Sequence, residues 1–255
     1  MNFTTSTGIV LHYKRQGKGE PLVFIHGLAS NLQSWNYQFQ HFCRSFDTLA
    51  YDCRGHGAST IPEVLSMQDH ANDAFEICSL FEQPVTVVGI SMGGYIVQNL
   101  MIQHPEIVKR AVLIATKSHG KGAATSKAAD TQEKTDPLEA RFRFSREFLY
   151  GPDTTDEQIH QYIKLEEQIP PEQFLLVNHA ITEFDYRPLL NKFNKPVLII
   201  HGDHDHLIQP EYGKELADII PNAQFVSIPN GGHAVMIDKP QEVNRAIETF
   251  LAETK

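Results

Sequence analysis

Apolar residues along this 255-residue chain gather in short unbroken runs separated by amphipathic stretches. Pro21–Ile25, Val85–Gly89 and Pro196–Ile200 show no regular apolar–polar alternation, which is typical of strands buried on both faces of a parallel sheet. Further strands are expected at Ile9–Arg15, Asp47–Tyr51, Arg110–Ala115 and Gln224–Ile228.

The stretches between these runs have helical periodicity. At 66–81, Ala71, Ala74 and Cys78 fall on one apolar stripe, and Ser66 with Asp69 three residues later predicts an N-terminal capping box. Other helices are expected at Gly94–Ile102, from Pro210 to about Ile220, and at Gln241–Ala252. Alternating strands and helices predict a doubly wound α/β domain with a mostly parallel sheet.

Residues 117–190 interrupt this alternation. Leu138, Phe142 and Phe148 fall at helical spacings, while Gly151-Pro152 and Pro170-Pro171 divide the segment. The sequence therefore predicts a core at 1–116 and 191–255, with a helical insertion at 117–190. Its aromatic residues, Phe142 and Phe144 among them, are expected either to line a substrate pocket or to form the core of the insertion.

Charge and cysteine content narrow the class of protein. The net charge is −9, from 31 acidic and 22 basic residues, and there is no basic run, which argues against nucleic acid or an anionic membrane as a partner. No apolar stretch reaches 18 residues, and the first residues lack the features of a secretory signal. Three irregularly spaced cysteines are typical of reduced thiols in a cytoplasmic protein. A monomer or a homodimer is expected.

The sequence Gly-Ile-Ser-Met-Gly at 89–93 lies between a predicted strand and a predicted helix. This is the setting of a nucleophile elbow, a sharp turn that holds a serine hydroxyl out of the packing. Such a turn needs two backbone N–H groups to bind an oxyanion. Met92 follows the serine, and Leu28 follows His26 and Gly27 in a loop after an earlier strand, so Leu28 and Met92 are the candidate donors.

A candidate acid and a candidate base follow in the order that an elbow predicts. Asp203 and Asp205 come after the strand that ends near Gly202, and His233 follows the last strand. His233 is expected to take the proton of Ser91, with an aspartate holding its imidazole. The run 201–206 alternates histidine and aspartate like a metal site, but successive loop residues rarely converge on one ion, so no metal and no cofactor are expected.

These pieces together make the chain similar to the α/β-hydrolases. The resemblance spans nearly the whole chain and includes His26-Gly27, the loop 52–59, the elbow, 202–205 and 231–233. It implies an eight-stranded sheet with a helical cap over the serine. The family's usual spacing implies Asp205 as the acid, with Asp203 as the alternative, and it places His26 and Gly27 beside the substrate.

The resemblance implies acyl transfer by Ser91 on a small-molecule carboxylic ester or lactone, like that of small carboxylesterases and 3-oxoadipate enol-lactonases. Because serine and not aspartate stands at the elbow, dehalogenase and epoxide hydrolase chemistry is disfavoured. Two alternatives stay open: a carbon–carbon bond hydrolase with the same triad, and a ligand receptor with slow hydrolysis.

Overall fold

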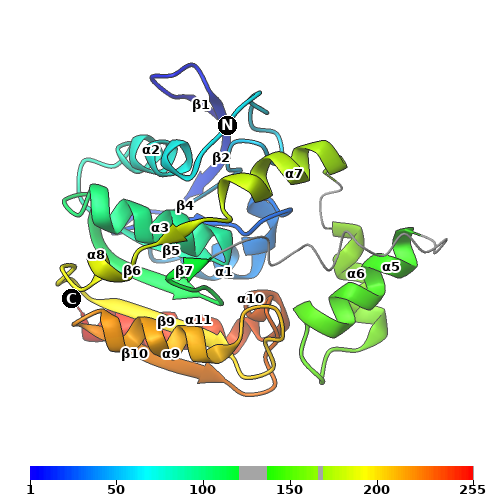
Figure 1. Ribbon diagram of the computed structural model, residues 1–255. Helices are drawn as coiled ribbons and strands as arrows, with labels where there is room; N and C mark the ends of the chain where they lie inside the picture. The colour runs from blue at the N-terminus through cyan, green and yellow to red at the C-terminus, as the bar shows by residue number, and fades with distance from the viewer. Residues whose placement is uncertain (121–136, 166–168, 255) are drawn as a thin grey trace.

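The computed structural model describes residues 1–120, 137–165 and 169–254. Eight strands form one sheet in the order β1-β2-β4-β3-β5-β6-β9-β10 (Figure 1). The β1–β2 and β2–β4 pairs are antiparallel, and all the later pairs are parallel. The strands are β1 (Asn2–Thr4), β2 (Val10–Gln16), β3 (Pro21–Ile25), β4 (Asp47–Tyr51), β5 (Val85–Ile90), β6 (Val108–Ile114), β9 (Val197–Gly202) and β10 (Ala223–Ile228). The predicted fold class is confirmed.

Successive residues of the central strands enter two different apolar cores. Val23 and Ile25 of β3 belong to one buried cluster, whereas Leu22 and Phe24 belong to a second cluster on the opposite face. β6 and β9 alternate in the same way. Because both faces of each strand meet apolar side chains, the strands carry no polar alternation in the sequence.

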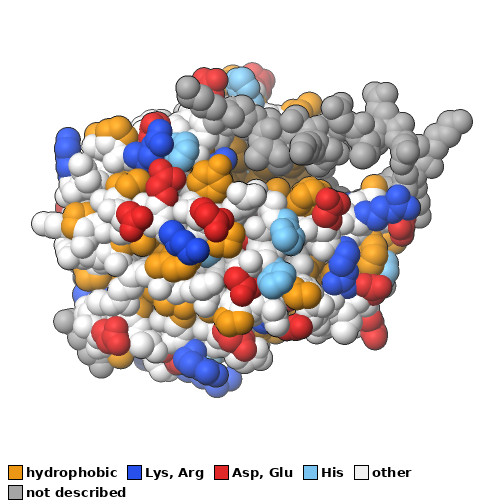
Figure 2. Space-filling view, turned by 60° about the horizontal axis from the view of Figure 1, so that its bottom comes forward, with side chains coloured by type: hydrophobic (Ala, Val, Ile, Leu, Met, Phe, Trp, Pro, Cys, Tyr) orange, Lys and Arg blue, Asp and Glu red, His pale blue; other side chains and the backbone are white. Residues whose placement is uncertain are grey.

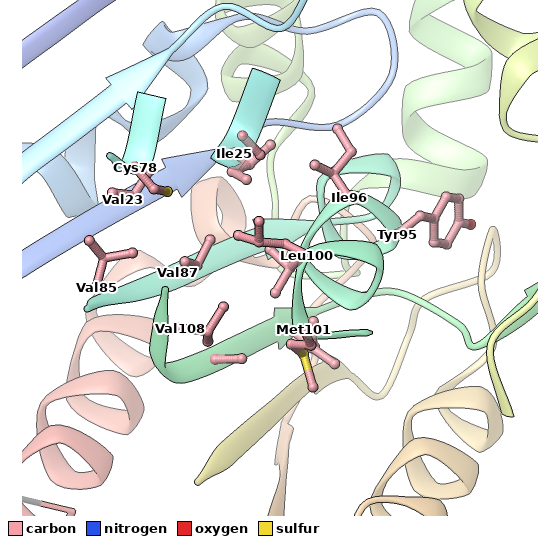
Figure 3. Close-up of a cluster of buried hydrophobic side chains, with 14 of the residues drawn as sticks. Val23, Ile25, Cys78, Val85, Val87, Tyr95, Ile96, Leu100, Met101 and Val108 are labelled. Atoms are coloured by element: carbon pink, nitrogen blue, oxygen red, sulfur yellow. The ribbon is translucent and has the colours of Figure 1, made fainter. Parts of the chain in front are cut away.

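Helices cover both faces of the sheet (Figure 1). The first cluster receives side chains from α2 (Met67–Cys78), α3 (Met92–Gln103) and α9 (Pro210–Ile219). The second receives them from α1 (Asn36–Phe42), α10 (Val235–Asp238) and α11 (Pro240–Glu253). Figure 3 shows Val87 of β5 and Leu100 of α3 among the buried side chains of the first cluster, in which α3, the helix that follows Ser91, packs on the central strand.

The part of the chain between β6 and β9 contributes, where it is described, no strand to the large sheet. Its elements are β7 (His119–Gly120), α5 (Pro137–Phe144), η2 (Ser145–Leu149), α6 (Asp156–Leu165), α7 (Pro171–Ala180), β8 (Phe184–Asp185) and α8 (Arg187–Leu190). Ile159 and Ile163 of α6 join the second cluster, and Val177 of α7 joins the first. Residues 121–136 and 166–168 lie outside the described residues, so the division at 117–190 stays a prediction.

The outer surface carries charges of both signs. Figure 2 shows acidic and basic side chains interspersed over one face of the molecule, with single apolar side chains between them. Over the described parts of the chain, no helix is both long enough and apolar enough to cross a membrane.

A layer of buried histidines ties together the loops that follow β3 and β4. The Nε2 atom of His26 accepts a hydrogen bond from the Cys53 N–H at 2.9 Å, and its Nδ1 atom donates to the Gly27 carbonyl at 2.7 Å. The Nε2 atom of His56 accepts from the Ala29 N–H at 3.2 Å. An imidazole that donates from one nitrogen and accepts at the other is neutral, so both rings hold the loops in their uncharged form.

Burial makes these histidines hard to protonate. It lowers the pKa of His26 to about 4. It lowers the pKa of His56 to about 3, with a further contribution from His26. His70 of α2 is also buried, and burial, reinforced by His56 and Arg54, lowers its pKa to about 3.

Ser66 caps α2 as the sequence predicts. Its hydroxyl accepts from the Asp69 N–H at 3.2 Å, and the Asp69 carboxylate accepts from the Ser66 N–H at 2.8 Å. We expect Ser66→Ala to lower the free energy of unfolding by about 1 kcal/mol in urea titrations, because one helix N–H loses its acceptor. Ser79→Ala, at the other end of α2, is the control and should cost less; an equal loss for the two variants would contradict the capping role.

The buried histidines should make the fold sensitive to acid. The unfolded chain binds protons on these residues near pH 6.5, whereas the folded chain does not until about pH 3 to 4, so stability falls as the pH drops below about 6.5. Each histidine adds a slope of up to about 1.4 kcal/mol per pH unit. In urea titrations between pH 6 and 5, the free energy of unfolding of His70→Gln should fall less steeply with decreasing pH than that of the wild type, by up to about 1.4 kcal/mol per pH unit. Equal dependence on pH for the two proteins would refute the assignment.

Candidate active site

Ser91 lies between the end of β5 and the start of α3 with a strained backbone. Its φ is 51° and its ψ is −116°, a conformation that costs a residue with a side chain roughly 1–3 kcal/mol. Three contacts hold it: the Ser91 N–H donates to the Ile114 carbonyl at 3.0 Å, and the Ser91 carbonyl accepts from the Gly94 N–H and the Thr116 hydroxyl, each at 2.9 Å. The side chain is half-buried. The turn therefore has the geometry of a nucleophile elbow.

The glycines on either side of the serine allow helix and strands to touch. A Cβ atom on Gly89 would stand 2.3 Å from the Gly93 carbonyl oxygen, and one on Gly93 would stand 2.3 Å from the Ile25 carbonyl oxygen. Both neighbours are backbone atoms that cannot move aside. A side chain at either position would push α3 away from the sheet and take Ser91 with it.

Two candidate oxyanion donors belong to residues next to the Ser91 turn. A Cβ on Gly27 would be 3.5 Å from the Ser91 Cβ, which places the loop containing Leu28 against the serine. Met92 begins α3, where helix geometry leaves the N–H without an acceptor. Among the described residues, neither the Leu28 nor the Met92 N–H has an acceptor. These two donors could bind a developing negative charge, and the positive end of α3 would add to the attraction.

His233 is bonded to Asp205. Its Nδ1 atom lies 2.8 Å from the Asp205 Oδ2 atom, and both side chains are buried. Asp203 is instead about 43% exposed in its side chain and pairs with His204 at 2.8 Å on the surface. The geometry thus brings His233 to the second of the two aspartates.

The Asp205 carboxylate is held ionised in a buried position. Its Oδ1 atom accepts from the Leu207 and Ile208 N–H groups at 2.9 and 2.8 Å. Its Oδ2 atom receives His233 and also lies 3.2 Å from the Nε2 atom of His201. Burial alone would raise the pKa of Asp205, but the charge of His233 and the N–H donors of His201 and His233 lower it to about 2. A carboxylate fixed in this way orients the imidazole and stabilises its protonated form.

His201 was considered in the sequence only as the first residue of the metal-like run 201–206, and its role beside Asp205 was not predicted. It is fully buried, and its Nε2 atom is also 2.8 Å from the Ile208 carbonyl, so that nitrogen carries the proton. Its position near the end of β9, just before the loop that holds Asp203 and Asp205, is the feature of the sequence that could have indicated this role. Within residues 1–120, 137–165 and 169–254, no three histidine, cysteine or acidic side chains are grouped to hold a metal ion.

Ser91 and the His233–Asp205 pair lie at the same edge of the sheet. Only β6 separates β5, which leads to Ser91, from β9, which leads to Asp205. Adjacent strands are about 4.8 Å apart, so the two loops start within about 10 Å of each other. In the described parts of the chain, no hydrogen bond joins the Ser91 hydroxyl to His233. The structure therefore joins the acid and the base directly and brings the serine to their edge.

The residues expected beside the substrate have different surroundings. His26 is fully buried with both nitrogens bonded, so we assign it to support of the loop instead of substrate contact. Gly27 lies against Ser91. Phe142 stacks on His160 with ring centroids 4.4 Å apart, and Phe144 packs against Phe148 at 5.2 Å. Both phenylalanines are only partly buried.

Comparison with known proteins gives consistent matches along the chain. Residues 22–246 match the family described as the alpha/beta hydrolase family. BpoC of Mycobacterium tuberculosis, which carries the name of a non-heme bromoperoxidase, is 30% identical over 264 residues, with 97% of this chain and 99% of BpoC covered. The 3-oxoadipate enol-lactonase 2 of Acinetobacter baylyi is 28% identical, with 97% and 95% covered.

Solved structures agree with the sequence matches. A thermophilic esterase from Thermogutta terrifontis superposes with a TM-score of 0.83 at 25% identity, over 100% of this chain and 98% of the esterase. The family match covers most of the chain, and the eight-stranded sheet carries an elbow serine, a buried His–Asp pair and two unused N–H groups at one edge. The chain is therefore a member of the alpha/beta hydrolase family.

Proposed function

We propose that the protein is a serine hydrolase that cleaves carboxylic esters or lactones of small molecules through an acyl-enzyme. One observation carries this proposal: the strained Ser91 turn lies beside two unused N–H donors and at the same edge as the His233–Asp205 pair. A nucleophile, a base held by an acid, and an oxyanion site are the parts that acyl transfer requires.

The reaction follows from these parts. His233 takes the proton of the Ser91 hydroxyl, whose oxygen attacks the carbonyl carbon of the substrate. The Leu28 and Met92 N–H groups bind the resulting oxyanion, each worth about 3 kcal/mol in the transition state. The oxyanion collapses, the carbon–oxygen bond to the leaving alkoxide breaks, and His233 gives its proton to that alkoxide. Water then repeats the sequence on the acyl-enzyme and releases the carboxylic acid. Asp205 stays ionised throughout, because its pKa is about 2.

The insertion at 117–190 is proposed to act as the cap that shapes the substrate pocket. Its α6 and α7 helices pack against the two cores of the sheet domain. The names of the relatives support small substrates with an ester-like carbonyl, since a lactonase and an esterase are among them. BpoC is named for a different reaction, so the relatives support the class of enzyme and do not select one substrate.

Turnover separates an enzyme from a slowly hydrolysing receptor. We expect steady multiple-turnover hydrolysis of p-nitrophenyl acetate or butyrate by the purified protein, because the site contains a base and a water-accessible serine. A burst of one p-nitrophenolate per chain with no steady rate after it would instead support the receptor. A panel of lactones and acyl esters then ranks the substrate classes.

Ser91→Ala is expected to lower the rate of p-nitrophenyl butyrate hydrolysis by about 10⁴–10⁶-fold, because the acyl-enzyme can no longer form. Alanine places the same Cβ in the strained turn, so urea unfolding should be nearly unchanged. In the wild type, mass spectrometry after treatment with a serine-reactive phosphonate should find the label on Ser91. Near-normal turnover by the variant would end the proposal.

Asp205→Asn and Asp203→Asn form a matched pair. The first places an amide against the imidazole of His233 and favours the wrong tautomer, so kcat should fall by about 10⁴-fold. The second changes an exposed carboxylate whose side-chain partner among the described residues is His204, and kcat should stay close to that of the wild type. If Asp203→Asn were the more damaging change, the acid would be assigned wrongly.

A further inference from the structure

The loop that carries His233 packs backbone against backbone on the insertion, and the Asn230 side chain also donates to the Asp153 carboxylate at 3.0 Å. A Cβ on Gly151 would stand 1.8 Å from the Asn230 carbonyl oxygen, and one on Gly232 would stand 2.5 Å from the Leu149 carbonyl oxygen. The Ala234 N–H donates to the Leu149 carbonyl at 2.8 Å. Residues 149–154, which we call the docked segment, therefore lie directly on the loop 230–234, which we call the base loop.

The Asp238 carboxylate bonds to both of these pieces of chain. The Asp238 Oδ2 atom accepts from the Gly232 N–H of the base loop and from the Gly151 N–H of the docked segment, each at 2.9 Å. Its Oδ1 atom accepts from the hydroxyl of Thr154, which is buried. Asp238 ends the short helix α10 that follows His233, and within the described parts of the chain no hydrogen bond or ion pair joins it to Asp205 or His233.

The opposite side of the base loop rests on the sheet domain. The His204 N–H donates to the Gly231 carbonyl at 2.9 Å, and a Cβ on Gly202 would stand 2.2 Å from the same oxygen. The base loop is thus held between the end of β9 and the docked segment. Removal of the docked segment would leave only one of these two walls in place.

We infer that Asp238 is a positioning residue for His233, and that it makes the placement of the base depend on the docked segment of the insertion. The inference rests on the proposed function, in which His233 is the general base. It assigns to residues 149–154 a part in positioning the base, in addition to any part that the insertion has in shaping the pocket.

The isosteric amide separates charge from geometry at Asp238. In Asp238→Asn, the amide oxygen can accept from both glycine N–H groups, and the amide nitrogen can donate to the Thr154 hydroxyl, so every hydrogen bond survives. Asp238→Ala loses all three. A positioning role therefore predicts that asparagine restores most of the function that alanine removes.

The experiment measures how fast Ser91 is labelled by a p-nitrophenyl phosphonate. In this step the Ser91 oxygen bonds to phosphorus, p-nitrophenolate leaves, and His233 takes the serine proton, so one coloured ion is released per labelled site. We expect Asp238→Ala to lower the second-order rate by about 100-fold, since a misplacement near 1 Å can have that effect. Asp238→Asn should label at nearly the wild-type rate.

Two variants on the insertion test the coupling without substituting any residue of the base loop. Gly151→Ala drives a methyl group into the Asn230 carbonyl and should slow labelling about as much as Asp238→Ala. Thr154→Val removes one hydrogen bond to Asp238 and should slow it less. Ser66→Ala, which weakens a distant helix cap, is the stability control and should label at the wild-type rate.

The pH dependence of labelling separates positioning from a general loss of folded protein. If His233 moves away from the Asp205 carboxylate in Asp238→Ala, the profile of labelling rate against pH should change its shape or position, whereas Asp238→Asn should keep the wild-type profile. A smaller folded fraction would scale the curve without moving it. Wild-type labelling rates in Asp238→Ala and Thr154→Val would overturn the inference and leave the proposed function intact. A wild type that carries no label on Ser91 would overturn both.

Discussion

The close approach of α3 to β5 and β3 is the constraint on which the site depends. Gly89 and Gly93 bring backbone against backbone, and Ser91 between them is forced to a positive φ. The energy to hold that strained residue comes from the packing of α3 on the first apolar core and from the bonds to Ile114 and Thr116. The position of the Ser91 hydroxyl therefore depends on the packing of the apolar core.

A second constraint is the buried carboxylate of Asp205. Two backbone N–H groups and two histidines surround it, so it remains charged where a lone carboxylate would take up a proton. The same arrangement explains why Asp203, only two residues away, lies at the surface. The turn in which the Asp205 N–H bonds to the Gly202 carbonyl directs one side chain inward and the other outward.

The fold could be predicted from sequence because its signals are local. Unbroken apolar runs marked the strands, and the predicted ends of β3 and β4 coincide with the observed ones. The short β1 and the helix α1 were not predicted, since a strand of three residues and a helix of seven residues, about two turns, give too little pattern. The role of Asp238 was missed for another reason: it comes from contacts with residues some 85 positions away, and no spacing in the sequence records such a contact. His201 lies only four residues from Asp205, but the loop conformation that brings the two side chains together cannot be read from the sequence.

The contact between the docked segment and the base loop also bears on how such chains diverge. Insertions between β6 and β9 leave the sheet unchanged, so recombination could in principle replace them freely to reach new substrates. Here the docked segment, which follows η2, is in close backbone contact with the base loop, more than 75 residues further along the chain. A grafted insertion would have to keep a glycine at 151 and a partner for Asp238, which leaves helices such as α7 as the more readily exchanged part.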